Sequence, residues 1–276
     1  MIKPDYPKVM GIINITPDSF YGRSRYLSQE EFMAVCTKMV EDGADIVDIG
    51  ACSTRPGSVP VSEEREWELL KPIVEIIPKL FPSLTFSVDT FRAGIVERVY
   101  EVAGNFTIND ISAGEDDEKM LSLAAGLKLP YIAMHKRGTP QTMQSLTNYD
   151  NIVDDICKYF IDFISKAKSI GIKDIIIDPG FGFAKTIRQN YTLLNSLRSF
   201  KFDDGAGGEY PLLVGLSRKA MIWKLLSITP DEALPATAAL NLQALLNGAD
   251  ILRVHDVKEA KQTVAIYRLL SAESST

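Results

Sequence analysis

Residues 174–180 read DIIIDPG, a short apolar run that ends in a carboxylate, Asp178, and in the turn residues Pro and Gly. Such a run is typical of a buried strand. Seven further stretches share this pattern of an apolar run with polar residues toward its end: VMGIINIT (9–16), DIVDIGA (45–51), TFSVDT (85–90), FTINDIS (106–112), PYIAMH (130–135), PLLVGLS (211–217) and ILRVHD (251–256). The sequence therefore predicts eight strands.

Amphipathic segments separate these runs. In residues 28–43, 63–80 and 150–171 apolar residues recur at intervals of three and four, which is typical of helices. Glycines that we expect to end helices stand at Gly43, Gly104, Gly126, Gly171 and Gly248. Eight repeats of strand and helix predict an α/β fold, a single (β/α)8 TIM barrel over residues 1–276 with its active site at the C-terminal face of the strands. An open doubly wound sheet is the structural alternative.

Composition and charge exclude several classes of function. The 276 residues carry a net charge of −6, so no general attraction to nucleic acid or acidic membranes is expected. No stretch reaches the roughly 18 apolar residues that span a bilayer, and the N-terminus has no signal-peptide pattern, so we expect a cytoplasmic protein. Three separated cysteines and only two histidines, His135 and His255, predict neither disulfides nor a zinc site of several histidines. Phosphate-loop, dinucleotide-binding and Gly-x-Ser-x-Gly motifs are absent from the sequence.

Polar residues stand near the carboxyl end of nearly every predicted strand. They are Asn14, Thr16, Asp48, Asp89, Asn109, Asp110, His135, Asp178, Ser217, Arg253 and His255. The strands of a parallel barrel are covered on both faces, so each such group needs a partner, and for any one residue a structural hydrogen bond explains it as well as a ligand does. Repetition on eight strands favours one large polar ligand at this end of the barrel. The loop DDGAGGE (203–209) precedes the seventh strand, so we expect it at the opposite end.

Several of these segments are similar, in order and content, to those of dihydropteroate synthases. They are GIINITPDSF (11–20), STRPGS (53–58), INDISAG (108–114), DPGFGF (178–183), GLSRKAMI (215–222) and LRVHDV (252–257), and SVDT (87–90) and MHKRGTPQTMQ (134–144) fit the same scheme. The chain resembles this family from about residue 9 to residue 270. The resemblance implies a transferase of folate biosynthesis that condenses (7,8-dihydropterin-6-yl)methyl diphosphate with 4-aminobenzoate, giving 7,8-dihydropteroate and diphosphate.

The resemblance also implies a set of substrate-binding residues. They are Thr54, Arg55, Pro56, Asp89, Asn109, Ile111, Met134, Asp178, Phe183, Gly215, Ser217, Lys219, Arg253, Val254 and His255, with Asp89, Lys219 and Arg253 as the catalytic residues. Asp178 and Asn109 suit the hydrogen-bonding edge of a pterin, because that edge presents both donors and acceptors. Met134 and Phe183 are implied as apolar walls of the ring, although plain barrel packing would explain both.

A cation and a second subunit are implied in the same way. Asn14 would help to hold Mg²⁺ against the diphosphate, with most ligands coming from phosphate and water. The two helical segments near the end of the chain, 233–246 and 259–270, would form a homodimer, although outer barrel helices are apolar on one side in any case.

Two segments depart from the family pattern. YGRSRY (21–26) replaces a Ser-Asp-Gly-Gly type of loop, and Cys52 stands where Glu is frequent. These departures leave the loop contacts to the aminobenzoate open. Two other functions also remain open: a methyltetrahydrofolate-binding domain of a corrinoid methyltransferase, and a pterin-binding barrel without catalysis.

Overall fold

Eight parallel strands form one sheet in the computed structural model, which describes residues 7–15, 28–52, 58 and 61–273. The strands of the described part are β1 (Lys8–Asn14), β2 (Ile46–Gly50), β3 (Thr85–Asp89), β4 (Thr107–Asp110), β5 (Tyr131–Met134), β6 (Ile175–Asp178), β7 (Leu213–Val214) and β8 (Ile251–Val254). They pair in the order β6-β5-β4-β3-β2-β1-β8-β7. The predicted eight strands are confirmed.

The sheet nearly closes into a barrel. Strand β1 pairs with both β2 and β8, so the last part of the chain returns to the first. Between β6 and β7 there is a single parallel bridge, Ile177 to Leu212, and the Ile177 N–H donates to the Pro211 carbonyl at 2.9 Å. A doubly wound sheet would reverse its strand order and would leave two free edges, so that alternative is wrong.

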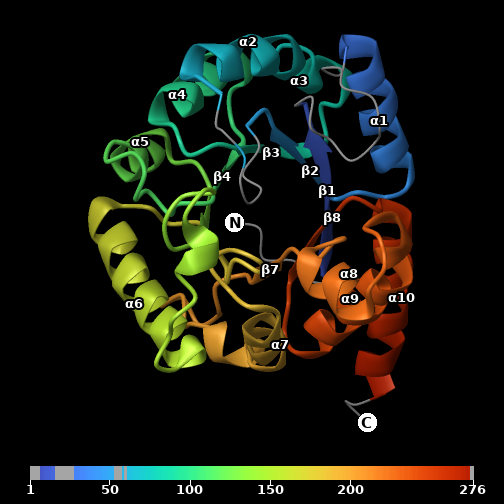
Figure 1. Cartoon of the computed structure of the whole chain (residues 1–276). Helices are drawn as coiled ribbons and strands as arrows, with labels where there is room; N and C mark the ends of the chain where they lie inside the picture. The colour runs from blue at the N-terminus through green and yellow to red at the C-terminus, as the bar shows by residue number, and fades with distance from the viewer. Residues whose placement is uncertain (1–6, 16–27, 53–57, 59–60, 274–276) are drawn as a thin grey trace.

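Helices surround the strands, as Figure 1 shows in a view onto the carboxyl ends of the strands. The helices of the described residues are α1 (Gln29–Glu41), α2 (Glu63–Val74), α3 (Ile77–Leu80), α4 (Ala93–Ala103), α5 (Met120–Leu127), α6 (Ile152–Ile170), α7 (Ile187–Asn195), α8 (Ala220–Leu226), α9 (Leu234–Leu246) and α10 (Val257–Glu273), with short 3-10 turns η1 (Met143–Ser145), η2 (Leu197–Phe200) and η3 (Asp231–Ala233). Helices α9 and α10 lie side by side on one flank of the ring.

Two expectations about the helices are wrong. The single helix expected over 63–80 is divided into α2 and α3, because Pro78 has no N–H to donate to the carbonyl of Val74. Gly126 lies inside α5 rather than after it, and Lys128 instead takes the left-handed conformation, at φ 57°, that ends the helix. Gly171 does end α6 as expected, at φ 106°.

The inside of the barrel changes from apolar to polar along the strands. A separate cluster of buried residues fills its lower part: Met10, Ile46, Ile132, Ile176, Leu213 and Ile251. Since alternate residues of a strand share a face, the residue two positions further on points the same way. On β2, β6 and β8 these residues are Asp48, Asp178 and Arg253. The strand-end polar side chains therefore lie directly above this cluster of apolar residues.

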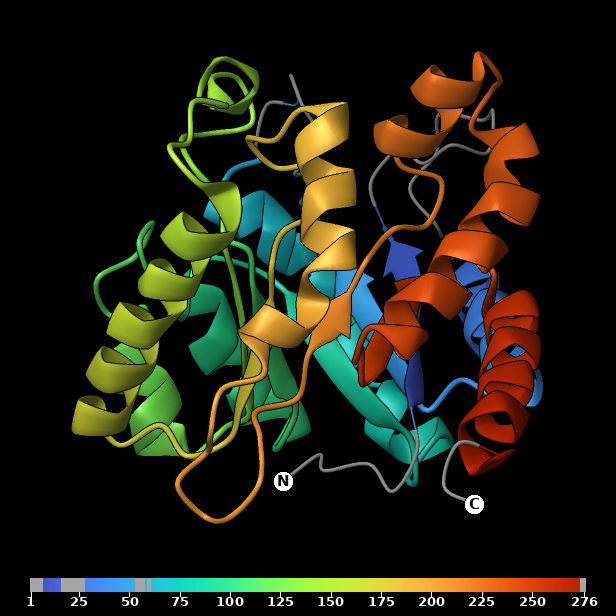
Figure 2. The same cartoon turned by 90° about the horizontal axis from the view of Figure 1, so that it is seen from below.

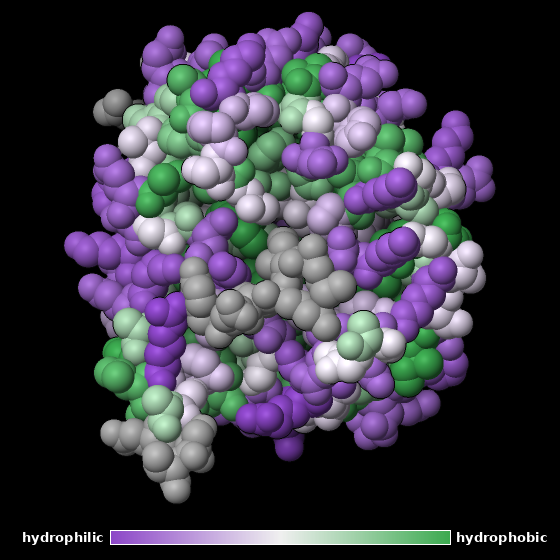
Figure 3. Space-filling view, turned by 180° about the vertical axis from the view of Figure 1, so that it is seen from behind, coloured by the Kyte–Doolittle hydropathy of each residue, from purple (hydrophilic) through white to green (hydrophobic). Residues whose placement is uncertain are grey.

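The other end of the barrel carries the loop over residues 203–209. In Figure 2, where the strand arrows point upward, this orange loop lies at the lower end, as predicted. An antiparallel bridge joins Asp203 to Glu209 at its base. Figure 3 looks onto this end and shows hydrophilic side chains around most of its rim. Of the described helices, none is both long and apolar enough to cross a bilayer.

Candidate functional site

Asp48 is the centre of a hydrogen-bond network that joins four strands. Its side chain is fully buried, and it accepts from the Ser87 hydroxyl at 2.5 Å and the Asn109 amide at 3.0 Å. The Arg253 Nε–H donates to the same carboxylate at 2.6 Å. Strands β2, β3, β4 and β8 thus meet at one carboxylate, which orients both Asn109 and Arg253.

Arg253 also binds the carboxylate of Asp89. Its second terminal nitrogen donates to Asp89 Oδ2 at 2.8 Å. Burial raises the pKa of Asp89 to about 7, while the charge of Arg253 opposes this rise. Burial also works against the charge of Arg253, but Asp48 and Asp89 keep the pKa of the guanidinium above its ordinary value. The cation is therefore held permanently charged between two carboxylates.

Lys219 and Asp178 form the other half of the cluster. Lys219, just before α8, donates from Nζ to the Phe181 carbonyl at 2.5 Å and lies 5.1 Å from the centre of the Phe183 ring. Burial lowers the pKa of Lys219 to about 8, and the Asp178 charge opposes this shift. Burial raises the pKa of Asp178, while Lys219 acts most strongly to lower it. The Gly180 N–H also donates to Asp178, at 2.8 Å.

Glycines let the two halves approach each other. A Cβ added to Gly215, after β7, would lie 3.8 Å from Arg253 Cβ and 4.0 Å from Lys219 Nζ. One added to Gly50 would lie 3.4 Å from Asn14 Oδ1 and 3.7 Å from Asp89 Oδ2. The side chains of Asn14, Asp89, Arg253 and Lys219 therefore lie close together at the carboxyl ends of the strands, and the region between them is called the recess.

Apolar side chains border this recess. Phe183 lies beside Lys219, and Met134 is buried with its Cγ near Gly180, where an added Cβ would approach it to 3.3 Å. Ile111 is also buried, but no contact among the described residues places it at the recess. Val254 is also buried, but its side chain belongs to the core between strands and helices. If Val254 binds a substrate, it does so through its backbone.

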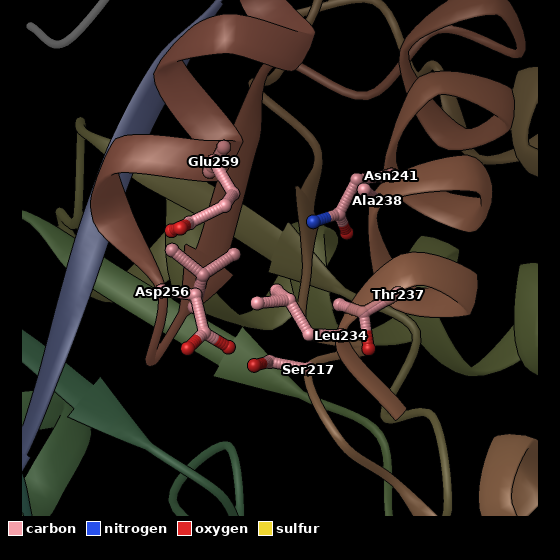
Figure 4. A pocket seen from close by; sticks show the side chains of 9 residues that line it. Ser217, Leu234, Thr237, Ala238, Asn241, Asp256 and Glu259 are labelled. Atoms are coloured by element: carbon pink, nitrogen blue, oxygen red, sulfur yellow. The ribbon is translucent and has the colours of Figure 1, made fainter. Parts of the chain in front are cut away.

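Ser217 and His255 lie together at the ends of β7 and β8. The Ser217 hydroxyl accepts from the His255 N–H at 3.2 Å and lies 3.1 Å from His255 Nδ1. Behind Ser217, a shallow pocket lies between α9 and α10. Figure 4 shows Asn241, Asp256 and Glu259 around it. This pocket lies outside the recess formed by Asp178, Lys219 and Arg253.

Two strand-end polar residues do not face the recess, and their expected convergence there is wrong. Asp110 directly follows Asn109 and so points to the opposite face, where it accepts from the Tyr131 hydroxyl at 2.5 Å and the Gly114 N–H at 2.7 Å. His135 follows Met134 and packs edge-on against Tyr159, with ring centres 4.9 Å apart. Both residues hold loops rather than line the recess.

Some predicted residues fall outside the described residues: Thr16, Thr54, Arg55 and Pro56, together with the YGRSRY segment. Cys52 is described. It is buried, and burial raises the pKa of its thiol.

Two residues of the site were not given a role from the sequence. Asp48 was recognised only as a polar strand end, although its alternation with Ile46 and Gly50 would have placed it inside the barrel. Lys185 gave no signal, because a lysine just before a helix usually lies in solvent, whereas this one is buried.

The recess combines three carboxylates with two cations. Asp89 and Asp178 can accept from a heterocycle with N–H groups, while Lys219 and Arg253 can donate to its oxygen or to an anion. Asp48, which is fully buried, orients Asn109 and Arg253. Within the described ranges no group of three His, Cys, Asp or Glu side chains could hold a metal ion.

Comparison with known proteins matches nearly the whole chain to pterin-binding enzymes. A family model described as "Pterin binding enzyme" matches residues 10–255. Dihydropteroate synthase of Escherichia coli strain K12 is 39% identical over 272 residues, which cover 98% of this chain and 93% of the relative. The Yersinia pestis dihydropteroate synthase with a sulfonamide drug has a TM-score of 0.90 at 35% identity, covering 97% of this chain and 95% of that one. The Burkholderia cenocepacia enzyme complexed with 7,8-dihydropteroate has a TM-score of 0.87 at 32% identity, covering 98% and 94%.

Proposed function

The chain belongs to the dihydropteroate synthases, transferases of folate biosynthesis within the pterin-binding enzymes, and we propose that its recess condenses (7,8-dihydropterin-6-yl)methyl diphosphate with 4-aminobenzoate. One observation carries this proposal: Arg253 is held by Asp48 and Asp89 while Lys219 stands beside Asp178 in the same recess. The Burkholderia relative with 7,8-dihydropteroate supports the same chemistry, since that molecule is the product expected here.

The hydrogen-bonding edge of the pterin is assigned to Asp178 and Asn109. Asp178 accepts from the ring N–H and the exocyclic amine, and Asn109 is oriented by Asp48 toward the same heterocycle. Lys219 donates to the ring oxygen or N5. Met134 and Phe183 cover the flat faces of the ring, and the guanidinium of Arg253 stacks on it.

The reaction is a substitution at the pterin methylene. The bond from the methylene carbon to the diphosphate oxygen breaks, and the electron pair leaves with diphosphate. The amine nitrogen of 4-aminobenzoate forms the new C–N bond and then loses a proton to solvent. Neutral arylamines are nucleophilic, so the protein needs no strong base, and its main contribution is orientation and stabilisation of the departing anion. Arg253, His255 and Ser217 are assigned to that anion.

Among the described residues of the recess, Asn14 is the one assigned to hold Mg²⁺. The Asn14 carboxamide oxygen is a hard ligand beside Gly50 and Asp89 at the edge of the recess, and the remaining ligands would be diphosphate oxygens and water. When bound, Mg²⁺ neutralises negative charge on the leaving diphosphate. Thr54, Arg55 and Pro56 lie outside the described residues, and their assignment to the diphosphate and the aminobenzoate rests on the family resemblance.

One assay separates this function from the two alternatives. The purified chain is mixed with the pterin diphosphate, Mg²⁺ and 4-aminobenzoate, and 7,8-dihydropteroate is measured. A synthase forms it with release of diphosphate. A methyl-transfer domain or a non-catalytic binding barrel would bind a pterin but would form no dihydropteroate, and that result would overturn the proposal.

We also propose a homodimer formed by α9 and α10. Four exposed large hydrophobic side chains lie on these two neighbouring helices: Leu246, Ile266, Leu269 and Leu270. Exposed apolar surface of this kind often marks an interface. The three cysteines, Cys36, Cys52 and Cys157, are free thiols, which supports a cytoplasmic location.

A further inference from the structure

Lys185, which directly follows the DPGFGFA segment, is a lysine with almost no contact with solvent. Only 3% of the residue is exposed. Its ammonium group donates to the carbonyls of Gly180 and Phe183, each at 2.9 Å, and lies 3.1 Å from His135 Nδ1. Together with the His135 carbonyl at 3.4 Å, these acceptors satisfy the three N–H bonds of an ammonium group. Burial lowers the pKa of His135 to about 2, so its ring is neutral and can accept.

These contacts tie the loop between β6 and α7 to the end of β5. Within this loop the Phe181 carbonyl accepts from Lys219, and the Phe183 ring lies beside the same ammonium group. Ala184, next to Lys185, adopts a left-handed φ of 51°, which a non-glycine residue keeps only when its surroundings hold it there. Lys185 therefore fixes the backbone that presents Phe181 and Phe183 to Lys219.

The same lysine adds positive charge near Asp178. The Asp178 side chain accepts from the Gly180 N–H, and the carbonyl of that glycine accepts from Lys185. Lys219, Arg253 and Lys185 all act on this buried carboxylate, from the loop after β7, from β8 and from the loop after β6. Burial lowers the pKa of Lys185 well below its ordinary value; the Asp178 charge opposes this shift, and the charges of Lys219 and Arg137 add to it, so Lys185 carries its charge most fully on the acid side. Of the three cations around Asp178, Lys185 is the one not assigned to a substrate.

We propose that Lys185 is a positioning residue of the pterin site, which holds the β6–α7 loop against β5 and places its ammonium group beside the turn that binds Asp178. This inference rests on the proposed function, because it assigns Lys185 to the carboxylate that is expected to bind the pterin. A purely structural lysine would hold the loop but would leave the titration of Asp178 unchanged.

The sign of the pH effect follows from the charges. Burial raises the pKa of Asp178, and the Lys185 charge partly offsets that rise. Removal of the charge raises this pKa further, so the ionised carboxylate is lost at a higher pH. The fall of kcat/KM on the acid side, which reports groups of the free enzyme, should therefore move upward.

The test compares Lys185→Gln, which keeps N–H donors but no charge, with Lys185→Arg, which keeps the charge. The matched control is Lys136→Gln, because Lys136 is equally buried on the neighbouring loop but pairs with Asp116. For Lys185→Gln we expect kcat/KM for the pterin diphosphate to fall by about 10- to 100-fold, mainly through KM. The pH at which its kcat/KM falls on the acid side, called the acid limb, should move upward by about half a pH unit or more. Lys185→Arg and Lys136→Gln should keep the wild-type limb.

The outcomes are distinguishable. An acid limb that is unchanged in folded Lys185→Gln, or moved equally in Lys136→Gln, would overturn the assignment. Should Lys185→Gln fail to fold by circular dichroism, Lys185→Arg decides, because a shifted limb in a variant that keeps the charge contradicts the proposal. If the wild-type chain itself forms no dihydropteroate, the proposed function fails instead.

Discussion

The backbone of Gly180 touches the backbone of His135 so closely that a Cβ added to the glycine would lie 2.0 Å from the His135 carbonyl oxygen. Gly180 also has a φ of +72°, which L residues with side chains rarely adopt. The contact joins the end of β5 to the loop that carries Phe181 and Phe183. The shape of the recess therefore depends on the absence of a side chain at this position.

Gly180→Ala should lower the free energy of unfolding by more than about 3 kcal/mol, because the methyl group meets rigid backbone and the left-handed conformation is strained as well. Urea unfolding followed by circular dichroism measures this loss. The matched control is Gly207→Ala. Gly207 has a similar φ of +82° but no atom within 4 Å of an added Cβ, so only the conformational cost of about 1 kcal/mol applies. Equal losses in the two variants would contradict the steric argument.

Arg253→Ala should lower kcat/KM by about 100- to 1000-fold, since it removes a cation assigned to the departing diphosphate and leaves Asp48 and Asp89 without their shared partner. Steady-state kinetics with both substrates measures the effect. Arg98→Ala, which breaks an ion pair with Glu64 on the outer surface, is the control and should keep wild-type kinetics. Near-normal turnover of Arg253→Ala would remove this residue from the mechanism.

The activity should decrease on the alkaline side as Lys219 loses its proton. The pKa of this lysine is lowered to about 8, so the ammonium group that donates to the pterin is present below that pH and is lost above it. We expect kcat/KM for the pterin diphosphate to fall above about pH 8. Lys219→Arg, which stays charged, should move this fall to higher pH. A profile that is flat to pH 10 in the wild-type enzyme would contradict the assignment.

Asn14→Ala should increase the Mg²⁺ concentration needed for half-maximal activity by roughly tenfold, because the variant loses the proposed protein ligand of the cation. Asn14→Asp keeps an oxygen ligand and should change this concentration less. Titration of turnover with Mg²⁺ after removal of metal by a chelator provides the measurement. An unchanged requirement in Asn14→Ala would show that the diphosphate holds the cation without Asn14.

Leu269→Asp should convert the proposed dimer to a monomer. This side chain is 73% exposed on α10, so a charge there has little effect on the folding of one protomer but opposes burial in an interface. Sedimentation velocity measures the mass. Leu80→Asp, at a side chain 54% exposed on α3, is the control and should leave the mass unchanged. A wild-type chain that sediments as a monomer would refute the dimer outright.

The fold could be predicted from the sequence because each strand carries the same local signal. A run such as DIIIDPG identifies its own strand, and eight repeats leave few arrangements besides a barrel. The errors arose where one residue decides the outcome: Pro78 divides the helix expected over 63–80, and Lys128 rather than Gly126 adopts the left-handed conformation after α5. Such choices depend on packing around a single residue, which periodicity does not describe.

The recess was predictable in part, because side-chain direction alternates along a strand. A polar residue two positions after an inward-facing apolar residue, such as Asp178 after Ile176, lies inside the barrel. Asp110 and His135 each come one position after an inward-facing residue and therefore face away from the recess. Lys185 could not be predicted, since its partners are backbone carbonyls brought together only by the folded loops. The roles assigned to individual side chains stay predictions until the variants are measured.

The hydrogen bond between Arg253 and Asp48 joins residues that are 205 positions apart. A ribosome therefore completes Asp48, Asp89 and Asp178 long before it adds Arg253. Until β8 inserts between β1 and β7, the growing chain would have to enclose Asp48 and Asp89 without the cation that they share, which is costly. Stable closure of the barrel and assembly of the recess are thus the same late event, and a fragment that stops before β8 should be recognised by the cell as unfinished protein.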